Sequence, residues 1–90
     1  MKITGELVGF KSIKSQKGND CFFGTVLYVD QRDNDLVGQK SIQINAFGSD
    51  AVSMAKIVND KKLLNCEVTV NGYFKKDDFA NFYAVTLEKA

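Results

Sequence analysis

The C-terminal half of the chain alternates between strand-like and helix-like patterns in an order that few folds accommodate. Its first run alternates polar and apolar side chains with the period of two typical of a half-buried strand. Apolar residues then recur at helical spacing, and a second alternating run, a charged turn and a third strand-like run follow. This order predicts a strand, a packed helix and a long β-hairpin. The runs are residues 41–48, 51–58, 68–74, 75–78 and 81–88.

The N-terminal half adds two strands rich in aromatic and β-branched residues, joined by a polar turn at residues 16–20. Gly5 and Gly9 interrupt the first strand, and a small barrel needs such bends. We therefore predict a mainly β, five-stranded Greek-key OB-fold barrel with one helix between strands three and four, forming a single domain over residues 1–90. The expected strands are Lys2–Lys14, Cys21–Asp30, Lys40–Phe47, Cys66–Lys75 and Asn81–Glu88, and the helix runs from a cap at Ser49 or Asp50 to near Lys62.

Asn71-Gly72 conflicts with this assignment, because the dipeptide favours a two-residue hairpin turn that would split the fourth strand. Only a short alternating stretch precedes it after the helix, and a better turn lies just beyond at Lys76-Asp77-Asp78. We therefore interpret Gly72 as a bend that helps to close the barrel.

The composition argues against a polybasic binder, because the formal net charge of the 90 residues is only +1. The charges are uneven, however: Lys11, Lys14 and Lys17 fall between Phe10 and Gly18 without an acidic residue. A local basic face is therefore compatible with the low net charge.

An enzyme is the least favoured class, and no catalytic residue, metal site or cofactor is predicted. The chain has no histidine, no convincing carboxylate pair and no glycine-rich phosphate loop. Cys21 and Cys66 lack metal-ligand spacing and are expected to be small apolar fillers. Asp33 and Asp35 are interpreted as part of a solvated loop rather than a cation site. With no apolar run long enough for a membrane span or signal peptide, we expect a cytoplasmic protein.

Alternation assigns the faces of strands three to five. In strand three, Ile42, Ile44 and Ala46 form the apolar set, which leaves Phe47 on the polar face. The set expected to face the core in strands four and five comprises Val68, Val70, Phe74, Tyr83, Val85 and Leu87. This assignment leaves Tyr73 and Phe82 on the outer face.

Strand two is ambiguous, because both of its faces carry bulky side chains. The more uniformly core-like set is Cys21, Phe23, Thr25, Leu27 and Val29. Assigning that set to the core places Phe22 and Tyr28 outside.

Aromatic residues on a polar sheet face, rimmed by lysines, suit the stacking of unpaired bases and contacts to phosphates. We assign Phe10 and Tyr73 to structural roles and leave the aromatics expected on the outer face and in the hairpin loop as candidates. The predicted nucleic-acid-binding residues are Phe79, Phe47, Tyr28, Phe22, Phe82, Lys11, Lys14, Lys17, Lys75 and Lys76.

Three segments of the chain resemble bacterial single-strand binding proteins. The segments are the opening strand Ile3-Thr4-Gly5-Glu6-Leu7, the strand-to-helix junction Ile44-Asn45-Ala46-Phe47-Gly48-Ser49-Asp50-Ala51 and the strand Val68-Thr69-Val70-Asn71-Gly72. That resemblance implies that Phe47 faces DNA. The chain is also similar in size and layout to the helix-destabilising proteins of filamentous phages, through residues 18–30 and 74–79. This second resemblance implies DNA contacts from Tyr28 and Phe79. The chain lacks tryptophan and has a low net charge, and these departures from the two families suggest a compact version from a phage, plasmid or other mobile element.

The expected function is largely sequence-independent binding of single-stranded DNA in replication, recombination or transfer. A homo-oligomer, with a dimer favoured, is expected because a barrel of this size has exposed strand edges. Two alternatives remain open: a replisome-accessory or protein-interaction OB domain whose aromatics form an interface, and a binder of single-stranded RNA.

Overall fold

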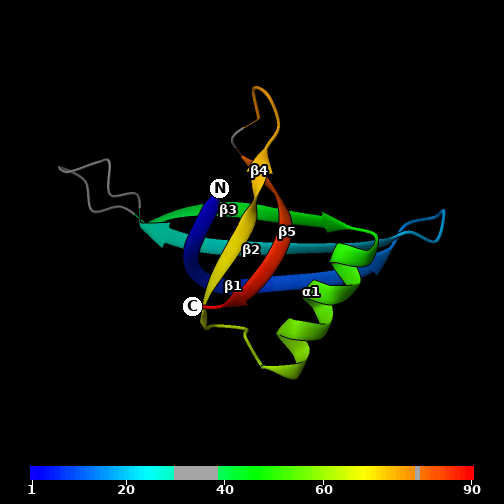
Figure 1. Cartoon of the computed structure of the whole chain (residues 1–90), viewed down its shortest axis with the longest axis horizontal. Coiled ribbons are helices and arrows are strands. Elements are labelled where there is room, and N and C mark those ends of the chain that lie inside the picture. Colours follow the sequence, from blue (N-terminus) through cyan, green and yellow to red (C-terminus); the bar gives the residue numbers. More distant parts are fainter. Residues whose placement is uncertain (30–38, 79) are drawn as a thin grey trace.

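The computed structural model describes residues 1–29, 39–78 and 80–90, and within these ranges the chain forms five strands and one helix (Figure 1). The elements are β1 (Lys2–Lys14), β2 (Asp20–Val29), β3 (Gln39–Phe47), α1 (Ser49–Asp60), β4 (Glu67–Phe74) and β5 (Asn81–Lys89). The strands close into a barrel in the order β1-β2-β3-β5-β4. A five-stranded barrel with one helix between β3 and β4 is the predicted OB fold.

The β1–β2 turn and the β4–β5 hairpin project from the barrel in different directions (Figure 1). The helix begins at Ser49, one of the two residues predicted to cap it, and no side chain caps it. Its N-cap position is Gly48, which has a φ of 66° that favours glycine. The capping roles expected of Ser49 and Asp50 were therefore wrong.

Closure of the barrel requires two glycines at points where backbones approach each other. A Cβ atom on Gly72 would clash with the carbonyl oxygen of Tyr83, and one on Gly5 would clash with the carbonyl oxygen of Leu27. The β4–β5 register also shifts between Asn71 and Gly72. The interpretation of Gly72 as a bend within one continuous strand is thus confirmed.

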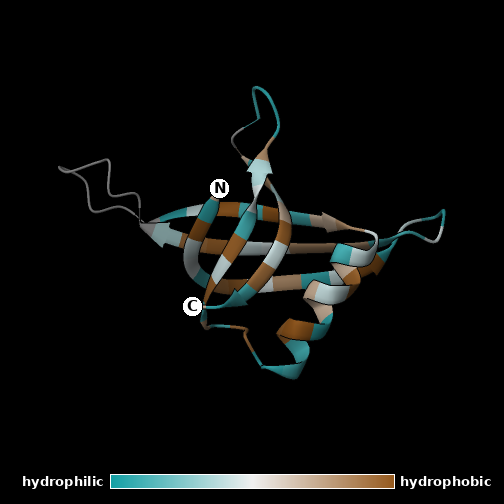
Figure 2. Cartoon of the chain, in the orientation of Figure 1, coloured by the Kyte–Doolittle hydropathy of each residue, from teal (hydrophilic) through white to brown (hydrophobic). Residues whose placement is uncertain are grey.

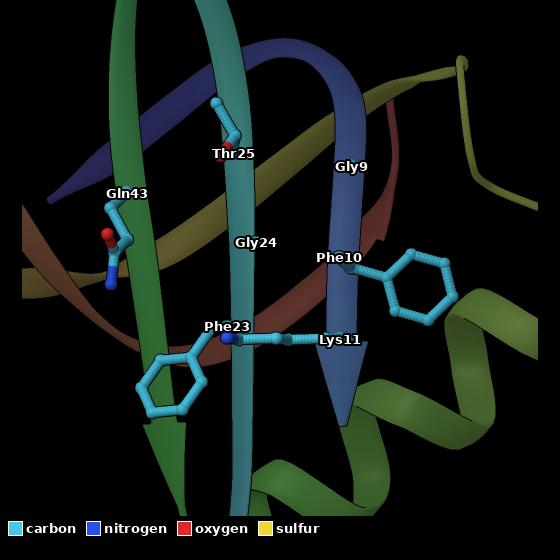
Figure 3. Close-up of a pocket in the computed structure, with 7 residues that line it drawn as sticks. All are labelled: Gly9, Phe10, Lys11, Phe23, Gly24, Thr25 and Gln43. Atoms are coloured by element: carbon cyan, nitrogen blue, oxygen red, sulfur yellow. The ribbon is translucent and has the colours of Figure 1, made fainter. Parts of the chain in front are cut away.

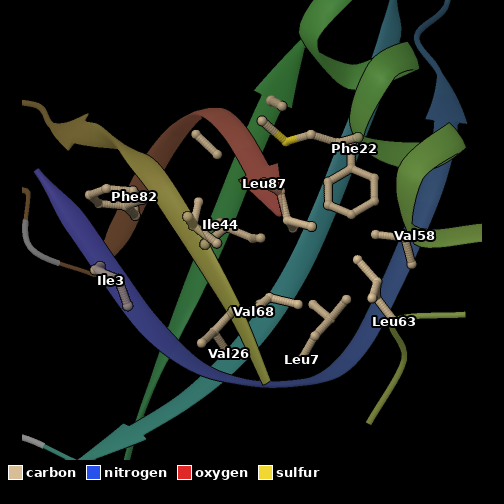
Figure 4. Close-up of a cluster of buried hydrophobic side chains, with 14 of the residues drawn as sticks. Ile3, Leu7, Phe22, Val26, Ile44, Val58, Leu63, Val68, Phe82 and Leu87 are labelled. Carbon is tan, nitrogen blue, oxygen red and sulfur yellow. The ribbon is translucent and has the colours of Figure 1, made fainter. Parts of the chain in front are cut away.

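The hydrophobic core fills the barrel and is closed at one end by α1 (Figure 4). From the helix, Ala51, Met54 and Val58 are buried against the strands. Apolar and polar residues alternate along the strands (Figure 2). The largest fully buried side chains are Phe22, Phe82, Leu7, Ile44, Met54, Leu63, Leu87, Val26, Val58, Val68 and Val70.

The predicted faces of β3 are confirmed, but those of β2 were wrong except at Cys21, which is buried as expected. Phe22 and Val26 are fully buried, whereas Phe23 is only half-buried and Thr25 is exposed. The reason lies at Gly24, which belongs to the inner set. A Cβ there would lie 3.1 Å from Ile44 and 3.2 Å from Leu7, so the core leaves little room for a side chain. Its missing side chain made the inner face seem less apolar than the outer one.

The predicted faces of β5 were also wrong in part. Phe82 and Ala84 are buried and Val85 is 46% exposed, although Leu87 is buried as expected. Asn71 pairs with Thr86 and Gly72 pairs with Ala84, so Val85 is an extra, unpaired residue. A bulge of this kind reverses the alternation on either side of it.

Some sequence predictions fall outside the described residues, namely the polar loop with Asp33 and Asp35, and the hairpin residue Phe79. The two cysteines are free thiols: Cys21 is buried in β2, and Cys66 is half-buried just before β4. Over the described ranges, no helix has the length and hydropathy needed to cross a membrane.

Candidate functional site

One row of directly paired residues crosses all five strands on the outside of the barrel. Lys11 of β1 lies opposite Phe23 of β2, and Phe23 lies opposite Asn45 of β3. Asn45 is in turn paired with Tyr83 of β5, and Tyr83 with Tyr73 of β4. Because directly opposed residues point to the same face of a sheet, the register itself brings these side chains together.

Phe47 joins this row and completes a continuous line of four rings. Its ring centroid lies 6.1 Å from that of Phe23 and 6.4 Å from that of Tyr83. Tyr83 stacks on Tyr73 at 5.8 Å with 19° between the ring planes. Phe47 and Tyr73 are 52% and 53% exposed, and the other two rings are half-buried. These four residues are named the aromatic track below.

A lysine stands at each side of the aromatic track. The Lys11 Nζ lies 6.0 Å from the ring centroid of Phe23, and the Lys75 Nζ lies 4.3 Å from that of Tyr83. Both distances are within the range of cation–π attraction. The ammonium groups therefore lie close to the rings, and the track combines flat apolar surfaces with positive charge.

The other predicted lysines are exposed but lie away from the rings, in or next to the two projecting turns. Lys14 is the last residue of β1 and Lys17 lies in the β1–β2 turn. Lys76 follows Lys75 in the β4–β5 turn. The structure therefore brings Lys11 and Lys75 to the track and leaves these three at its periphery.

An open groove of about 550 Å³ lies beside the track on β1, β2 and β3 (Figure 3). Gly9 contributes to the open space of this groove, because it has no side chain and a Cβ on it would meet no atom within 4 Å. Lys11 and Phe23 belong to both the groove and the row. The lining residues are Gly9, Phe10, Lys11, Phe23, Gly24, Thr25 and Gln43.

A chain of side-chain hydrogen bonds runs from the groove to the base of the β4–β5 hairpin. Gln43 Nε2 donates to Asn45 Oδ1 at 2.8 Å, and Asn45 Nδ2 donates to Asn81 Oδ1 at 3.3 Å. Asn81 Nδ2 then donates to Asp78 Oδ2 at 3.3 Å. Asn45 is only 5% exposed, and this chain satisfies both ends of its amide. These four residues are named the amide relay.

The arrangement suits a ligand with flat, apolar faces, polar edges and negative charges. Rings offer stacking surfaces, the groove offers amide and hydroxyl groups, and the lysines offer positive charge. In the described part of the chain, no three His, Cys, Asp or Glu residues cluster to hold a metal ion.

The aromatic candidates from the sequence separate into three groups. Phe47 lies on the outer face as predicted, whereas Phe22 and Phe82 are fully buried and have no face to offer a ligand. Tyr28 is half-buried and packs against the core, so its placement on the outer face was wrong. Phe79 lies outside the described residues.

Sequence reasoning missed three of the four rings of the track. Phe23 and Tyr83 were assigned to the core, and Tyr73 was placed outside but given a structural role. Phe10 does have a structural position, stacked on Phe22 with 5.8 Å between ring centroids. The polar side chains of Thr25 and Asn81, each two residues from a missed ring, were the available signal that Phe23 and Tyr83 face outward.

Comparison with known proteins identifies the fold. Two structures of the protein PriB from Ralstonia solanacearum are similar to this chain, with TM-scores of 0.73 and 0.71 and identities of 14% and 15%. The first match covers 100% of this chain and 96% of that one, and the second covers 99% and 94%. An SSB domain from Synechococcus sp. has a TM-score of 0.72 at 12% identity, over 97% of this chain and 90% of that domain. No family model and no curated protein matches the sequence. At these identities, the likeness establishes that the chain shares its fold with PriB and with the SSB domain.

Proposed function

We propose that this protein binds single-stranded DNA, largely without sequence preference, by stacking bases on the aromatic track. Lys11 and Lys75 contact the phosphates on either side of the stacked bases. The observation that carries the proposal is the unbroken line of four rings across the barrel, flanked by two ammonium groups. Base–aromatic stacking contributes about 1–3 kcal/mol per base and tolerates any base.

The geometry favours single strands over duplex, because a ring can stack only on a base whose face is free. Bases in a duplex already stack on their neighbours and expose only their edges in the grooves. The low net charge of +1 points in the same direction, since duplex binding without sequence preference depends mainly on phosphate neutralisation.

The fold likeness to an SSB domain supports the proposal and agrees with the resemblance drawn from the sequence. A non-catalytic role in replication, recombination or transfer of a genome, in the cytoplasm, remains our prediction. So does a dimer, which size-exclusion chromatography with light scattering would test. Lys14, Lys17 and Lys76 remain proposed contacts at the margins of the track, and Phe79 also remains a proposed contact.

The direct test is fluorescence anisotropy of a labelled 30-nucleotide dT oligomer, titrated with protein at low and at moderate salt. A matched duplex serves as the competitor and control. We expect saturable binding of the single strand that weakens as salt rises, because the lysines displace counterions from phosphates. Duplex should compete poorly.

Absence of binding at micromolar protein and low salt would contradict the proposal. The track would then be interpreted as an interface between protein subunits, because exposed aromatics are also typical of protein-binding surfaces. A matched RNA oligomer in the same titration distinguishes DNA from RNA through the 2′-hydroxyl.

A further inference from the structure

The turn that carries Lys75 is tied to the barrel by one acidic side chain. Asp78 Oδ1 accepts hydrogen bonds from the backbone N–H groups of Ala80 and Asn81 at 3.2 and 3.3 Å. The other carboxylate oxygen accepts a hydrogen bond from the side-chain amide of Asn81 at 3.3 Å. The backbone N–H of Asp78 donates to the carbonyl oxygen of Lys75 at 3.1 Å, which closes the turn. Asp78 therefore joins the backbone of Lys75 directly to the start of β5.

The start of β5 is itself attached to β3 by the rest of the amide relay. The side chain of Asn81 accepts a hydrogen bond from Asn45, which is only 5% exposed. The backbone N–H of Gln43 donates to the carbonyl oxygen of Ala80 at 3.4 Å, and the side chain of Gln43 donates to Asn45. Because Asn45 is buried, this anchor belongs to the barrel wall, where local opening is rarer than in a projecting hairpin.

Lys75 needs such an anchor, because its side chain is long and exposed in the hairpin that projects from the barrel (Figure 1). The Lys75 Nζ lies 4.3 Å from the ring centroid of Tyr83, but a contact at the ammonium end leaves the start of the side chain to be placed by the backbone of the turn. A turn that is ordered before the ligand arrives loses less conformational entropy on binding. The hydrogen bonds of Asp78 are therefore expected to favour a phosphate contact from Lys75.

We infer that Asp78 is a positioning residue for DNA binding, and that it strengthens binding by holding the Lys75 turn beside the aromatic track. This inference rests on the proposed function, because the bound strand supplies the phosphate. Asp78 exerts two effects of opposite sign. Its negative charge repels a polyanion, whereas its hydrogen bonds favour binding through Lys75. Removal of the side chain therefore shows which effect is larger.

The first variant is Asp78→Ala, which removes all three hydrogen bonds that the carboxylate accepts. We expect the affinity for the dT oligomer to fall roughly threefold to tenfold at low salt, the range of one net hydrogen bond, although the protein has lost a negative charge. Fluorescence anisotropy measures this affinity. Unchanged or tighter binding would overturn the inference, because electrostatic repulsion would then be the main effect of Asp78.

The neighbouring variant Asp77→Asn is the control for charge. It removes one negative charge from the same turn, but the side chain of Asp77 takes no part in the hydrogen bonds of Asp78. Its φ of 61° is one that asparagine tolerates. We expect binding by Asp77→Asn to be unchanged or slightly tighter than that of the wild type. A loss equal to that of Asp78→Ala would overturn the inference, because the loss would not depend on the hydrogen bonds of Asp78.

A double-mutant cycle separates the positioning of Lys75 from general damage to the fold. In the wild-type background, Lys75→Gln should make the slope of log affinity against log salt shallower by about 0.7, the value for one phosphate contact to a single strand. In the Asp78→Ala background, the same substitution should change the slope little, because Lys75 has already lost its position. An undiminished effect of Lys75→Gln in that background would overturn the inference.

Thermal unfolding followed by circular dichroism shows whether Asp78→Ala is folded. If it is not, Asp78→Asn replaces it, because an amide oxygen still accepts hydrogen bonds from the two backbone N–H groups. Asp78→Asn removes the same charge as Asp77→Asn and should bind the oligomer more weakly than that control. Equal affinities of the two Asn variants would overturn the inference and leave the proposed function intact. Failure of the wild type to bind the oligomer would contradict the proposed function itself.

Discussion

In two pairs of adjacent aromatic residues of this barrel, one member belongs to the core and the other to the outer surface. Phe22 and Phe82 are fully buried, whereas their immediate neighbours Phe23 and Tyr83 lie on the outer aromatic track. Both pairs lie in strands, where successive side chains point to opposite faces. The core and the candidate binding surface therefore occupy alternate positions of the same strands, and substitution can alter either one separately.

The largest separation is expected between Phe82→Ala and Tyr83→Ala. Removing Phe82 leaves a cavity in the core and should lower the free energy of unfolding by about 3–5 kcal/mol. Removing Tyr83 should cost about 1 kcal/mol or less, because half-buried surface residues contribute little. Urea denaturation followed by circular dichroism measures both. Equal losses in the two variants would contradict the assignment of faces in β5.

The fold was predictable because its signals are local and agree with one another. Alternation in residues 41–48, helical spacing after it and the turn at Lys76-Asp77-Asp78 are each encoded within a few residues. Few topologies accommodate these elements in this order, so the order predicts the barrel. The position of Phe47 was predictable for the same reason, since its strand alternates without a break.

The faces of β2 and β5 were only weakly indicated by the sequence, through Thr25 and Asn81, because each face also depends on a contact distant in sequence. The inner face of β2 includes Gly24, and the reason for a glycine there is the close packing of Leu7 and Ile44 against it, which the sequence does not reveal. The bulge at Val85 arises because Gly72 pairs with Ala84 while its neighbour Asn71 pairs with Thr86 across the hairpin. The amide relay likewise joins residues up to 36 positions apart, from Asn45 to Asn81, that no sequence pattern links.

The next largest effect on stability is expected from a substitution at Gly72, with Gly9 as the matched control. Gly72→Ala should destabilise the barrel by roughly 1–3 kcal/mol, because its Cβ would clash with the rigid carbonyl of Tyr83. Gly9→Ala is the matched change at an open position and should leave the free energy of unfolding unchanged or slightly raised. Thermal unfolding compares the two variants, and a stable Gly72→Ala protein would show that the close approach is not needed for closure.

A third comparison sets the track against an apolar residue that is equally exposed elsewhere. Phe47→Ala should weaken binding of the dT oligomer by about 1–3 kcal/mol, the contribution of one stacked base. Val52 of α1 is 50% exposed, close to the 52% of Phe47, but lies off the track. Val52→Ala should therefore bind normally. Similar losses in both variants would indicate that general surface hydrophobicity, rather than stacking, drives association.

The smallest effect on DNA binding is expected from substitutions of the two lysines beside the track. Lys11→Gln and Lys75→Gln should each make the slope of log affinity against log salt shallower by about 0.7, because each removes roughly one phosphate contact to a single strand. The exposed helix residue Lys56 is the control, and Lys56→Gln should leave the slope unchanged. Anisotropy titrations at several salt concentrations provide the slopes. If all three variants change the slope equally, DNA responds to the overall charge of the protein, and the two lysines beside the rings have no special position in binding.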